Sequence, residues 1–288
     1  MTSDPDKILV IKLSALGDFI QALGPMKAIR QAHPDAYITL MTTRPFASMG
    51  LDCGYFNDIW VDDRPKFTDF RKYVALKKKF NAGRFDRVYD LQNNDRTALY
   101  FKLLIPWIRS GPEWVGAAKG ASYRDDPKIR SKEHAFQSHI RMLGLAGIQN
   151  VGFDDLSWMG QDIDLPELQD HYAVLIPGSS PQHPEKRWPV MHFTAFAQKL
   201  YAEGIQPVLI GTRDENVITS EIALNCPGAL DLTGQTSLYD IAALARRAKV
   251  VVGNDTGPIH IAALTGAPCV TLFCTRKSDP IKHAPVGP

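Results

Sequence analysis

The sequence predicts an α/β protein built on parallel β-sheets, because one pattern occurs near both ends of the chain. Near the start, an apolar run at 7–13 is followed by a turn, a helical pattern and a second apolar run at 37–41. Near the end, the apolar run at 250–252 is followed by a loop, a short helical pattern and another apolar run at 269–273. Strand, helix and strand in this order make βαβ units, whose strands pair in parallel. We therefore expect a parallel sheet in each half of the chain.

The length and composition indicate a globular protein of two domains. The chain has 288 residues, of which 44% are hydrophobic and 22% are charged, which is enough for two separate cores. The segment 147–166 is acidic and shows no clear hydrophobic period. We place the domain boundary in this segment, giving domains at 1–165 and 166–288.

Charge, hydropathy and cysteine content exclude several classes of protein. A net charge of +2 does not indicate a protein that binds polyanions through its whole surface. The N-terminal residues are polar, and no apolar stretch approaches the ~18 residues of a membrane-spanning helix. The cysteines have no metal-binding or disulfide spacing, so we expect reduced thiols in a cytoplasmic protein and no zinc site. They are Cys53, Cys226, Cys269 and Cys274.

The loop after the apolar run at 250–252 has the features of an anion site. Asp255 and Thr256 are residues that cap helices, and Gly257 lets a ligand approach the backbone closely. Pro258 suits the start of a helix, whose free N–H groups and dipole attract anions. His260 lies in the first turn of that helix. An ordinary capped turn between strand and helix has the same features, so the residue types alone leave both interpretations open.

Asp18 follows the first predicted strand, at the edge of the sheet where α/β proteins bind ligands. A carboxylate there is suited to act as a general base, or simply as a charge at a helix N-terminus. The turn contains Gly17 alone among glycines and lacks the Gly-x-Gly-x-x-Gly pattern. An enzyme that uses a nicotinamide or flavin cofactor is therefore disfavoured.

Two segments of the second half carry groups that suit a nucleotide. After the predicted strand at 172–176, the chain places Ser179 and Ser180 beside a glycine, and Lys186 follows. Hydroxyls and an ammonium group suit phosphate oxygens, although a proline-rich surface loop has the same composition. After the predicted strand at 207–210 comes Glu215, which could accept hydrogen bonds from ribose hydroxyls or act as a helix N-terminal acid.

The first half contains a basic segment and a polar cluster. Residues 64–87 hold nine Lys and Arg side chains against two Asp. They are either the solvated face of a helix or a surface for an anionic acceptor or an anionic membrane, and no nucleic-acid-binding motif accompanies them. The cluster at 92–96 follows a predicted strand at 87–91 and precedes a helical pattern at 97–108.

Three strings resemble the signatures of one family. Residues 254–263 read NDTGPIHIAA, residues 13–18 read LSALGD, and residues 177–189 contain Pro-Gly-Ser and Lys-Arg-Trp-Pro. Together they are similar to glycosyltransferase family 9, the ADP-heptose–lipopolysaccharide heptosyltransferases. The resemblance implies two Rossmann-like domains facing a cleft, the GT-B architecture, with the acceptor in the first domain and the nucleotide sugar in the second. Family members usually continue into a segment that crosses back to the first domain, and the stretch 274–279 lacks their usual glycine.

The resemblance also implies roles for individual residues. Asp18 would be the catalytic base, and Asn93 and Arg96 would contact the acceptor. The groups that bind the donor, including its diphosphate and ribose, would be Ser179, Ser180, Lys186, Glu215, Asp255, Thr256, Gly257 and His260.

The function implied is inverting transfer of heptose from ADP-L-glycero-D-manno-heptose to the lipopolysaccharide inner core, either Kdo–lipid A or a core heptose. No cofactor or metal is expected, and the partners would be the nucleotide sugar, the anionic acceptor and, peripherally, the inner face of an anionic inner membrane, without nucleic acid. The alternatives are a non-catalytic or truncated member that binds nucleotide sugar, and a nucleotide-sugar epimerase of the same architecture.

Overall fold

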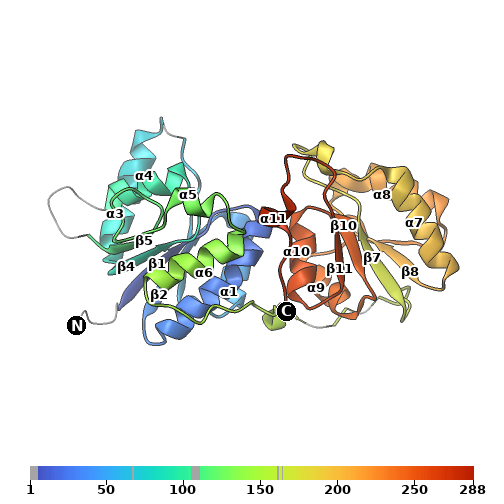
Figure 1. Ribbon diagram of the computed structural model, residues 1–288, viewed down its shortest axis with the longest axis horizontal. Helices are drawn as coiled ribbons and strands as arrows, with labels where there is room; N and C mark the ends of the chain where they lie inside the picture. Colours follow the sequence, from blue (N-terminus) through green and yellow to red (C-terminus); the bar gives the residue numbers. More distant parts are fainter. Residues whose placement is uncertain (1–5, 67, 105–110, 161, 164) are drawn as a thin grey trace. The chain divides into compact units, whose positions relative to one another are not determined.

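The computed structural model describes residues 6–66, 68–104, 111–160, 162–163 and 165–288. The chain divides into two compact units, Met1–Gly152 and Phe153–Pro288 (Figure 1). The division lies inside the segment 147–166, in which the sequence shows no regular period.

Unit 1 is built on a parallel sheet, which we call sheet A. Among the described residues it has six strands in the order β3-β2-β1-β4-β5-β6. The strands are β1 (Lys7–Ile11), β2 (Tyr37–Thr42), β3 (Asp58–Val61), β4 (Arg87–Asp90), β5 (Glu113–Gly116) and β6 (Tyr123–Arg124). In the central strand β1, Ile8 pairs with Ile38 on one side and with Arg87 on the other. Residues 8–11 are fully buried, as expected for a parallel strand covered on both faces.

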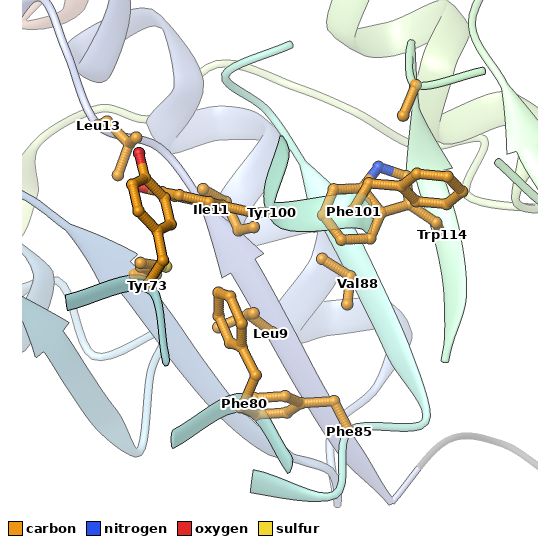
Figure 2. Close-up of a cluster of buried hydrophobic side chains, with 12 residues drawn as sticks. Leu9, Ile11, Leu13, Tyr73, Phe80, Phe85, Val88, Tyr100, Phe101 and Trp114 are labelled. Atoms are coloured by element: carbon orange, nitrogen blue, oxygen red, sulfur yellow. The ribbon is translucent and has the colours of Figure 1, made fainter. Parts of the chain in front are cut away.

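Helices cover both faces of sheet A. On one face, Leu9 and Ile11 of β1 join a core cluster with Tyr73 and Phe80 of α3 and with aromatic residues of α4 (Figure 2). Helices α1 and α6 pack against each other. The helices of unit 1 are α1 (Leu16–Ala32), α2 (Ala47–Asp52), α3 (Phe70–Gly83), α4 (Asp95–Leu104), α5 (Pro127–Arg130) and α6 (Ala135–Leu145), with a 3-10 turn at Arg44–Phe46.

Unit 2 repeats this plan with sheet B, in the order β11-β10-β7-β8-β9. Its strands are β7 (Tyr172–Ile176), β8 (Gln206–Leu209), β9 (Leu230–Asp231), β10 (Val251–Asn254) and β11 (Cys269–Leu272), and all of their pairings are parallel. Its helices are α7 (Val190–Ala202), α8 (Asn216–Asn225), α9 (Leu238–Arg247), α10 (Gly257–Leu264) and α11 (Pro280–His283), with 3-10 turns at Ser157–Met159, Pro184–Lys186 and Arg213–Glu215. Apolar residues of α7 and α8 pack on β7 and β8 in a second core cluster.

Each sheet has one point where the strand order reverses. In sheet A it lies between β1 and β4, and in sheet B between β7 and β10. Loops leave the carboxyl ends of these neighbouring strands in opposite directions, and α/β proteins bind ligands in the crevice that results. The loops after β1, β4, β7 and β10 and the first turns of the helices that follow them carry most of the site residues that the sequence predicts.

The predicted α/β class and its two parallel sheets are confirmed. The helix expected at 97–108 is α4, and the rest of that range, 105–108, lies outside the described residues. Asp18 lies in the first turn of α1, which begins at Leu16, rather than in the preceding turn. Among the described residues, no helix combines the length and apolar character needed to span a bilayer.

Candidate functional site

In unit 2, Asn254 at the end of β10 joins the loops at the reversal point of sheet B. Its amide nitrogen donates to the carbonyls of Pro177 (2.8 Å) and Gly178 (3.1 Å), which follow β7. Its amide oxygen accepts a hydrogen bond from the backbone N–H of Trp188 (2.9 Å). Asn254 is completely buried, so these bonds stabilise the loop that carries Lys186 against the end of β10.

Lys186 and Asp255 form an ion pair, and Ser278 and His260 lie close to its carboxylate. The ammonium nitrogen of Lys186 lies 2.7 Å from Oδ2 of Asp255, and the hydroxyl of Ser278 donates to the same carboxylate oxygen. His260 lies behind them, with Nε2 4.0 Å from Oδ1 of Asp255. Asp255 and His260 are buried, whereas the Lys186 side chain is 27% exposed. The positive group is therefore the one that a ligand in solvent can reach.

The pKa of Asp255 lies below its ordinary value. Burial of the carboxyl group raises this pKa, but the hydrogen bonds from Lys186 and Ser278 and the positive charge of Lys186 outweigh burial. The Asp255 carboxylate is thus kept ionised, and it holds the ammonium group of Lys186 where the loops after β7 and β10 meet.

Ser179 and Ser180 differ in whether a ligand in solvent can reach their hydroxyls. The hydroxyl of Ser179 donates to the carbonyl of His183 (2.9 Å) and accepts from the guanidinium of Arg187 (3.0 Å), which also donates to the Ser179 carbonyl. Ser179 is buried and ties the loop together, while Ser180 is exposed.

Glu215 lies beside the same loops at the end of β8. Its carboxylate accepts from the backbone N–H (2.6 Å) and the hydroxyl (3.0 Å) of Thr212, so it caps the 3-10 turn Arg213–Glu215. Any Cβ at position 178 would overlap this carboxylate. Gly178 is therefore required for Glu215 to approach the loop after β7, and Glu215 occupies the helix N-terminal role that is one of the two expected for it.

Helix α10 begins without a side-chain cap. Thr256 is its N-cap residue, but the Thr256 hydroxyl contacts the carbonyl of Asn254 and makes no capping bond. Gly257 and Pro258 form the first turn and are half-buried. Helix α10 begins two residues after Asp255, whose carboxylate and carbonyl contact Lys186, so the helix start and the ammonium group belong to one part of the unit, and both kinds of group suit an anion.

In unit 1, the turn that precedes Asp18 is held by three other loops. The side-chain oxygen of Gln92 accepts from the backbone N–H groups of Leu13 (2.7 Å) and Ser14 (3.0 Å). The carbonyl of Leu13 accepts from the hydroxyl of Thr43 (2.8 Å) and the guanidinium of Arg64 (2.7 Å). Asp18 itself is exposed, and its carboxylate accepts from the backbone N–H of Ala15 (3.2 Å).

Three buried titratable side chains, Lys12, Asp90 and His139, lie near the turn before Asp18. The ammonium group of Lys12 donates to the carbonyl of Leu91 (3.1 Å), which is also 3.2 Å from Nε2 of His139. The pKa of Lys12 lies below its ordinary value, because burial lowers it by more than the negative charges of Asp18 and Asp90 raise it. Burial raises the pKa of Asp90 to about 6, although its carboxylate accepts from the backbone N–H groups of Gln92 and Asn93. Asp90 thus supports the loop whose Gln92 holds the turn before Asp18.

The two residues expected to contact an acceptor make structural contacts. Asn93 is buried at a positive φ of 50°, and its side chain bonds to the backbone N–H of Ala117 (2.6 Å) and to the sulfur of Met142. Arg96 donates to the carbonyl of Pro65 (2.9 Å) and is half-buried. Asn93 thus fixes the loop after β4, and Arg96 holds the segment that follows β3.

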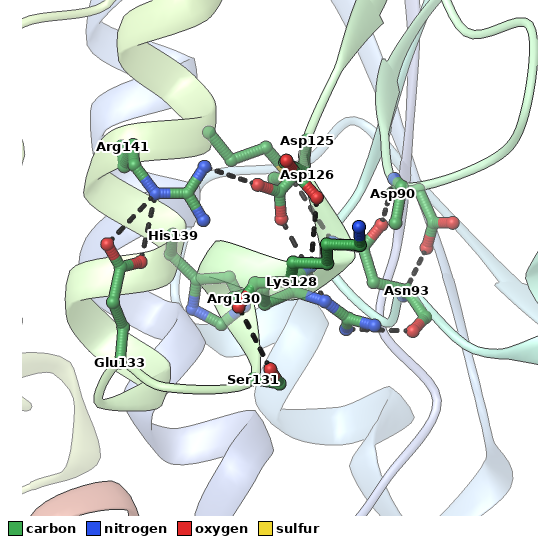
Figure 3. Close-up of polar contacts among 12 residues, drawn as sticks. Asp90, Asn93, Asp125, Asp126, Lys128, Arg130, Ser131, Glu133, His139 and Arg141 are labelled. Atoms are coloured by element: carbon green, nitrogen blue, oxygen red, sulfur yellow. Dashed lines mark hydrogen bonds and ion pairs between the residues drawn. The ribbon is translucent and has the colours of Figure 1, made fainter.

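Beside Asn93 lies an ionic cluster formed by Asp125, Arg130, Glu133 and Arg141 (Figure 3). Arg141 is 2.5 Å from Asp125 and 2.9 Å from Glu133, and Arg130 donates to the carbonyl of Asn93 (2.9 Å). Burial raises the pKa of Asp125, and the bond from Arg141 opposes this rise. The cluster anchors α5 and α6 to the loop after β4.

Several positioning residues were missed by sequence reasoning. Gln92, Arg187 and Asn254 lie within or beside the segments singled out from the sequence, but which backbone groups they bind depends on the tertiary fold. Thr43 and Ser278 carry no signal in the sequence, because single hydroxyl residues in loops are common.

Comparison with known proteins identifies the family. The family model described as glycosyltransferase family 9 (heptosyltransferase) matches residues 73–288. The chain belongs to this glycosyltransferase family. It is 27% identical over 319 aligned positions to lipopolysaccharide heptosyltransferase 2 of Escherichia coli K12, an alignment that covers 96% of this chain and 86% of that protein. The family member described here is therefore an enzyme, a glycosyltransferase, as the three sequence strings predicted.

Solved structures of the family share the fold. A glycosyltransferase family 9 protein of Veillonella parvula superimposes with a TM-score of 0.78 at 22% identity, covering 97% of this chain and 84% of that one. ADP-heptose lipopolysaccharide heptosyltransferase II of E. coli gives 0.74 at 22% identity, covering 98% and 88%. These similarities confirm the GT-B class of the two-sheet architecture.

Proposed function

We propose that this family member transfers heptose from ADP-L-glycero-D-manno-heptose to the lipopolysaccharide inner core, with inversion at the anomeric carbon. The observation that carries the proposal is the group formed by Lys186, Asp255 and the start of α10 at the reversal point of sheet B. Relatives named as lipopolysaccharide heptosyltransferases over nearly the full chain support heptose and a lipopolysaccharide acceptor, and the E. coli structure named for ADP-heptose supports the nucleotide.

The leaving group of such a reaction is ADP, so negative charge grows on its phosphate oxygens. Lys186 supplies a partly exposed ammonium group, and the N–H of Gly257 with the α10 dipole supplies further positive potential. His260, behind Asp255, adds positive charge when it is protonated. Ser180 is exposed, and its hydroxyl, which accepts from the backbone N–H of Gln182 (3.4 Å), could donate to a phosphate, whereas Ser179 would act chiefly by holding the loop.

Glu215 would hold the ribose of the donor. A ribose hydroxyl would donate to the carboxylate oxygen that does not accept from Thr212, so the cap and the ligand contact are compatible. Asp18 would accept the proton of the acceptor hydroxyl as its oxygen attacks the anomeric carbon. Its exposure and its fixed position after the tethered turn suit this role.

Asn93 and Arg96 would define the acceptor region mainly by fixing loops.

We propose that the transfer reaction requires no metal ion. Among the residues that the structure describes, no group of three or more His, Cys, Asp or Glu side chains is arranged to hold a metal ion. The positive groups around Lys186 would perform the stabilisation of the diphosphate. Turnover in EDTA at the same rate as in Mg²⁺ is the expected result, and a rate that needs added Mg²⁺ would contradict it.

The test of the proposal combines binding with turnover. Calorimetric titration with ADP, UDP, GDP and NAD should give binding of ADP in preference to the others. Incubation with ADP-heptose and a Kdo–lipid A acceptor should then give a heptosylated product by mass spectrometry, with inverted anomeric configuration by NMR. Asp18→Asn should retain ADP binding and lose transfer. Preference for UDP with release of an epimerised sugar would establish the epimerase alternative, and ADP binding without transfer would establish a non-catalytic member.

A further inference from the structure

The chain that leaves β11 turns back toward the end of β10. These two strands are parallel, and Asn254 pairs with Leu272, so both strands end at the same edge of sheet B. The backbone N–H of Asp255 also donates to the carbonyl of Leu272 (3.2 Å). Just beyond β11, the backbone N–H of Ser278 donates to the carbonyl of Thr275 (3.2 Å) and closes a tight turn. We call residues 275–278 the β11 turn, and it brings Ser278 beside Asp255.

The β11 turn contacts the ion pair of Lys186 and Asp255 in two ways. The hydroxyl of Ser278 donates to Oδ2 of Asp255, the same oxygen that accepts from the ammonium group of Lys186. The ammonium nitrogen of Lys277 lies 3.7 Å from the carboxylate of Glu185, the residue that precedes Lys186. The Lys277 side chain is 82% exposed, and exposed ion pairs contribute little to stability. Ser278 is therefore the stronger link between the β11 turn and the ion pair.

The two donors to Asp255 differ in their access to solvent. The Lys186 side chain is 27% exposed, whereas Ser278 is 4% exposed. A diphosphate that binds Lys186 competes with Asp255 for the ammonium group. A buried carboxylate that loses a hydrogen-bond donor is strongly destabilised. The second oxygen of Asp255, Oδ1, lies 4.0 Å from Nε2 of His260, which is longer than a hydrogen bond. The buried hydroxyl of Ser278 is thus the donor that can stay on the carboxylate when Lys186 turns to a ligand.

We propose that Ser278 is a positioning residue for the diphosphate of the nucleotide sugar. Its hydroxyl holds the Asp255 carboxylate in place while the ammonium group of Lys186 is shared with the phosphate oxygens. Without this hydroxyl, Asp255 depends more on Lys186 and holds the ammonium group away from the ligand. The inference rests on the proposed role of Lys186 in binding the donor.

The experiment is a double-mutant cycle, measured by calorimetric titration of the full chain with ADP and with inorganic pyrophosphate. Ser278→Ala should weaken the binding of both ligands about tenfold. In Lys186→Met there is no ammonium group to exchange partners, so adding Ser278→Ala should weaken binding no further. A tenfold loss of affinity from Ser278→Ala in both backgrounds would overturn the proposal, because a general structural defect acts whether or not Lys186 is present.

The control is Ser237→Ala, the same substitution at another site in unit 2. The Ser237 side chain accepts from the backbone N–H of Asp240 (3.2 Å) and caps α9. Its loss should lower the melting temperature but leave the binding of both ligands unchanged. Ser278→Thr keeps the hydroxyl and should bind ADP within about threefold of wild type. Equal losses of affinity in Ser237→Ala and Ser278→Ala, or in Ser278→Thr and Ser278→Ala, would contradict a positioning role.

Heptosyl transfer by the wild type is measured separately. Transfer together with additive losses in the cycle would remove the role of Ser278 and leave the proposed function standing. Coupled losses with pyrophosphate, but no binding of ADP and no transfer, would keep the role of Ser278 and overturn the proposed function. A wild type that binds neither ligand would overturn the role of Ser278.

Discussion

The ammonium group of Lys186 lies 2.7 Å from the carboxylate of Asp255, although the two residues are 69 positions apart. Lys186 follows β7 and Asp255 follows β10, the neighbouring strands at which the order of sheet B reverses. The pair therefore marks the point where the two loops of the candidate donor site meet. Because Asp255 is buried and Lys186 is partly exposed, the proposed phosphate contact would reach Lys186 from solvent while its partner stays in place.

Replacing Lys186 by Met should weaken ADP binding about 10- to 100-fold, since a charge-assisted hydrogen bond to a phosphate is worth about 1.5–3 kcal/mol. Calorimetric titration measures the change. Lys199→Met, at an exposed position on α7, is the matched control and should bind ADP like wild type. Unchanged affinity in Lys186→Met would remove this residue from the proposed donor site.

The tether from Gln92 to the turn before Asp18 predicts a second, separate effect. Gln92→Met leaves the N–H groups of Leu13 and Ser14 without their side-chain acceptor, so the turn should loosen and the turnover number should fall at least about tenfold. ADP affinity should stay the same, because Gln92 lies in unit 1.

Gln92→Glu is the conservative variant for this test. A carboxylate can accept the same two hydrogen bonds, so a substantial part of the turnover should return. Equal turnover in Gln92→Met and wild type would show that the tether does not position the base. A loss of ADP binding in Gln92→Met would instead indicate a general structural defect.

Much of the fold could be predicted because it depends on local patterns. The β-branched runs of β1, β7 and β10 and the helical stretches between them follow from hydrophobic period alone. Helix α8 was not predicted, since Val217 and Leu224 are exposed and blur its apolar face. The turn expected around Gly17 is instead the start of α1, because Leu16 and Gly17 form the first helical turn.

The candidate site was less predictable, because its contacts join residues far apart in the chain. Motif strings pointed to Lys186 and Asp255, but no local rule pairs them. Ser179 was expected to face a phosphate, and the structure shows its hydroxyl bound to His183 and Arg187. Competition between backbone and ligand for one hydroxyl is decided by tertiary structure, which the sequence pattern does not contain.

Asp90 and His139 predict opposite pH dependences of stability. Burial raises the pKa of Asp90 from 3.8 to about 6, so its contribution is present at low pH and is lost as the pH rises from about 4 to about 6. Burial, aided by the charge of Lys12, lowers the pKa of His139 from 6.5 to about 3. Its contribution is present above pH 6.5 and is lost as the pH falls toward 3.

The contributions of Asp90 and His139 to the free energy of unfolding therefore change in opposite directions between about pH 4 and pH 6. Asp90→Asn should make the free energy of unfolding rise more steeply with pH than in wild type, by about 1 kcal/mol per pH unit. His139→Gln, which can still donate to the Leu91 carbonyl, should produce the opposite change. Urea unfolding at several pH values measures both. Profiles parallel to wild type would mean that neither group is perturbed by burial.

A pair of glycine substitutions tests how Glu215 is positioned. Gly178→Ala places a methyl group where the Glu215 carboxylate lies, so Glu215 should leave Thr212 and ADP affinity should fall about tenfold. Gly144→Ala is the control, because a Cβ there meets nothing within 4 Å in helix α6, and it should stabilise the fold by roughly 0.5–1 kcal/mol.

The double variant Gly178→Ala with Glu215→Ala separates this effect from general damage to the loop. If Gly178→Ala acts by displacing the carboxylate, the double variant should bind ADP no more weakly than Glu215→Ala alone, because both changes remove the same interaction. Additive losses would show that the methyl group disturbs the backbone of the Pro177–Ser180 loop directly. In that case the bonds from Asn254 to Pro177 and Gly178, rather than the space occupied by Glu215, would explain the requirement for glycine.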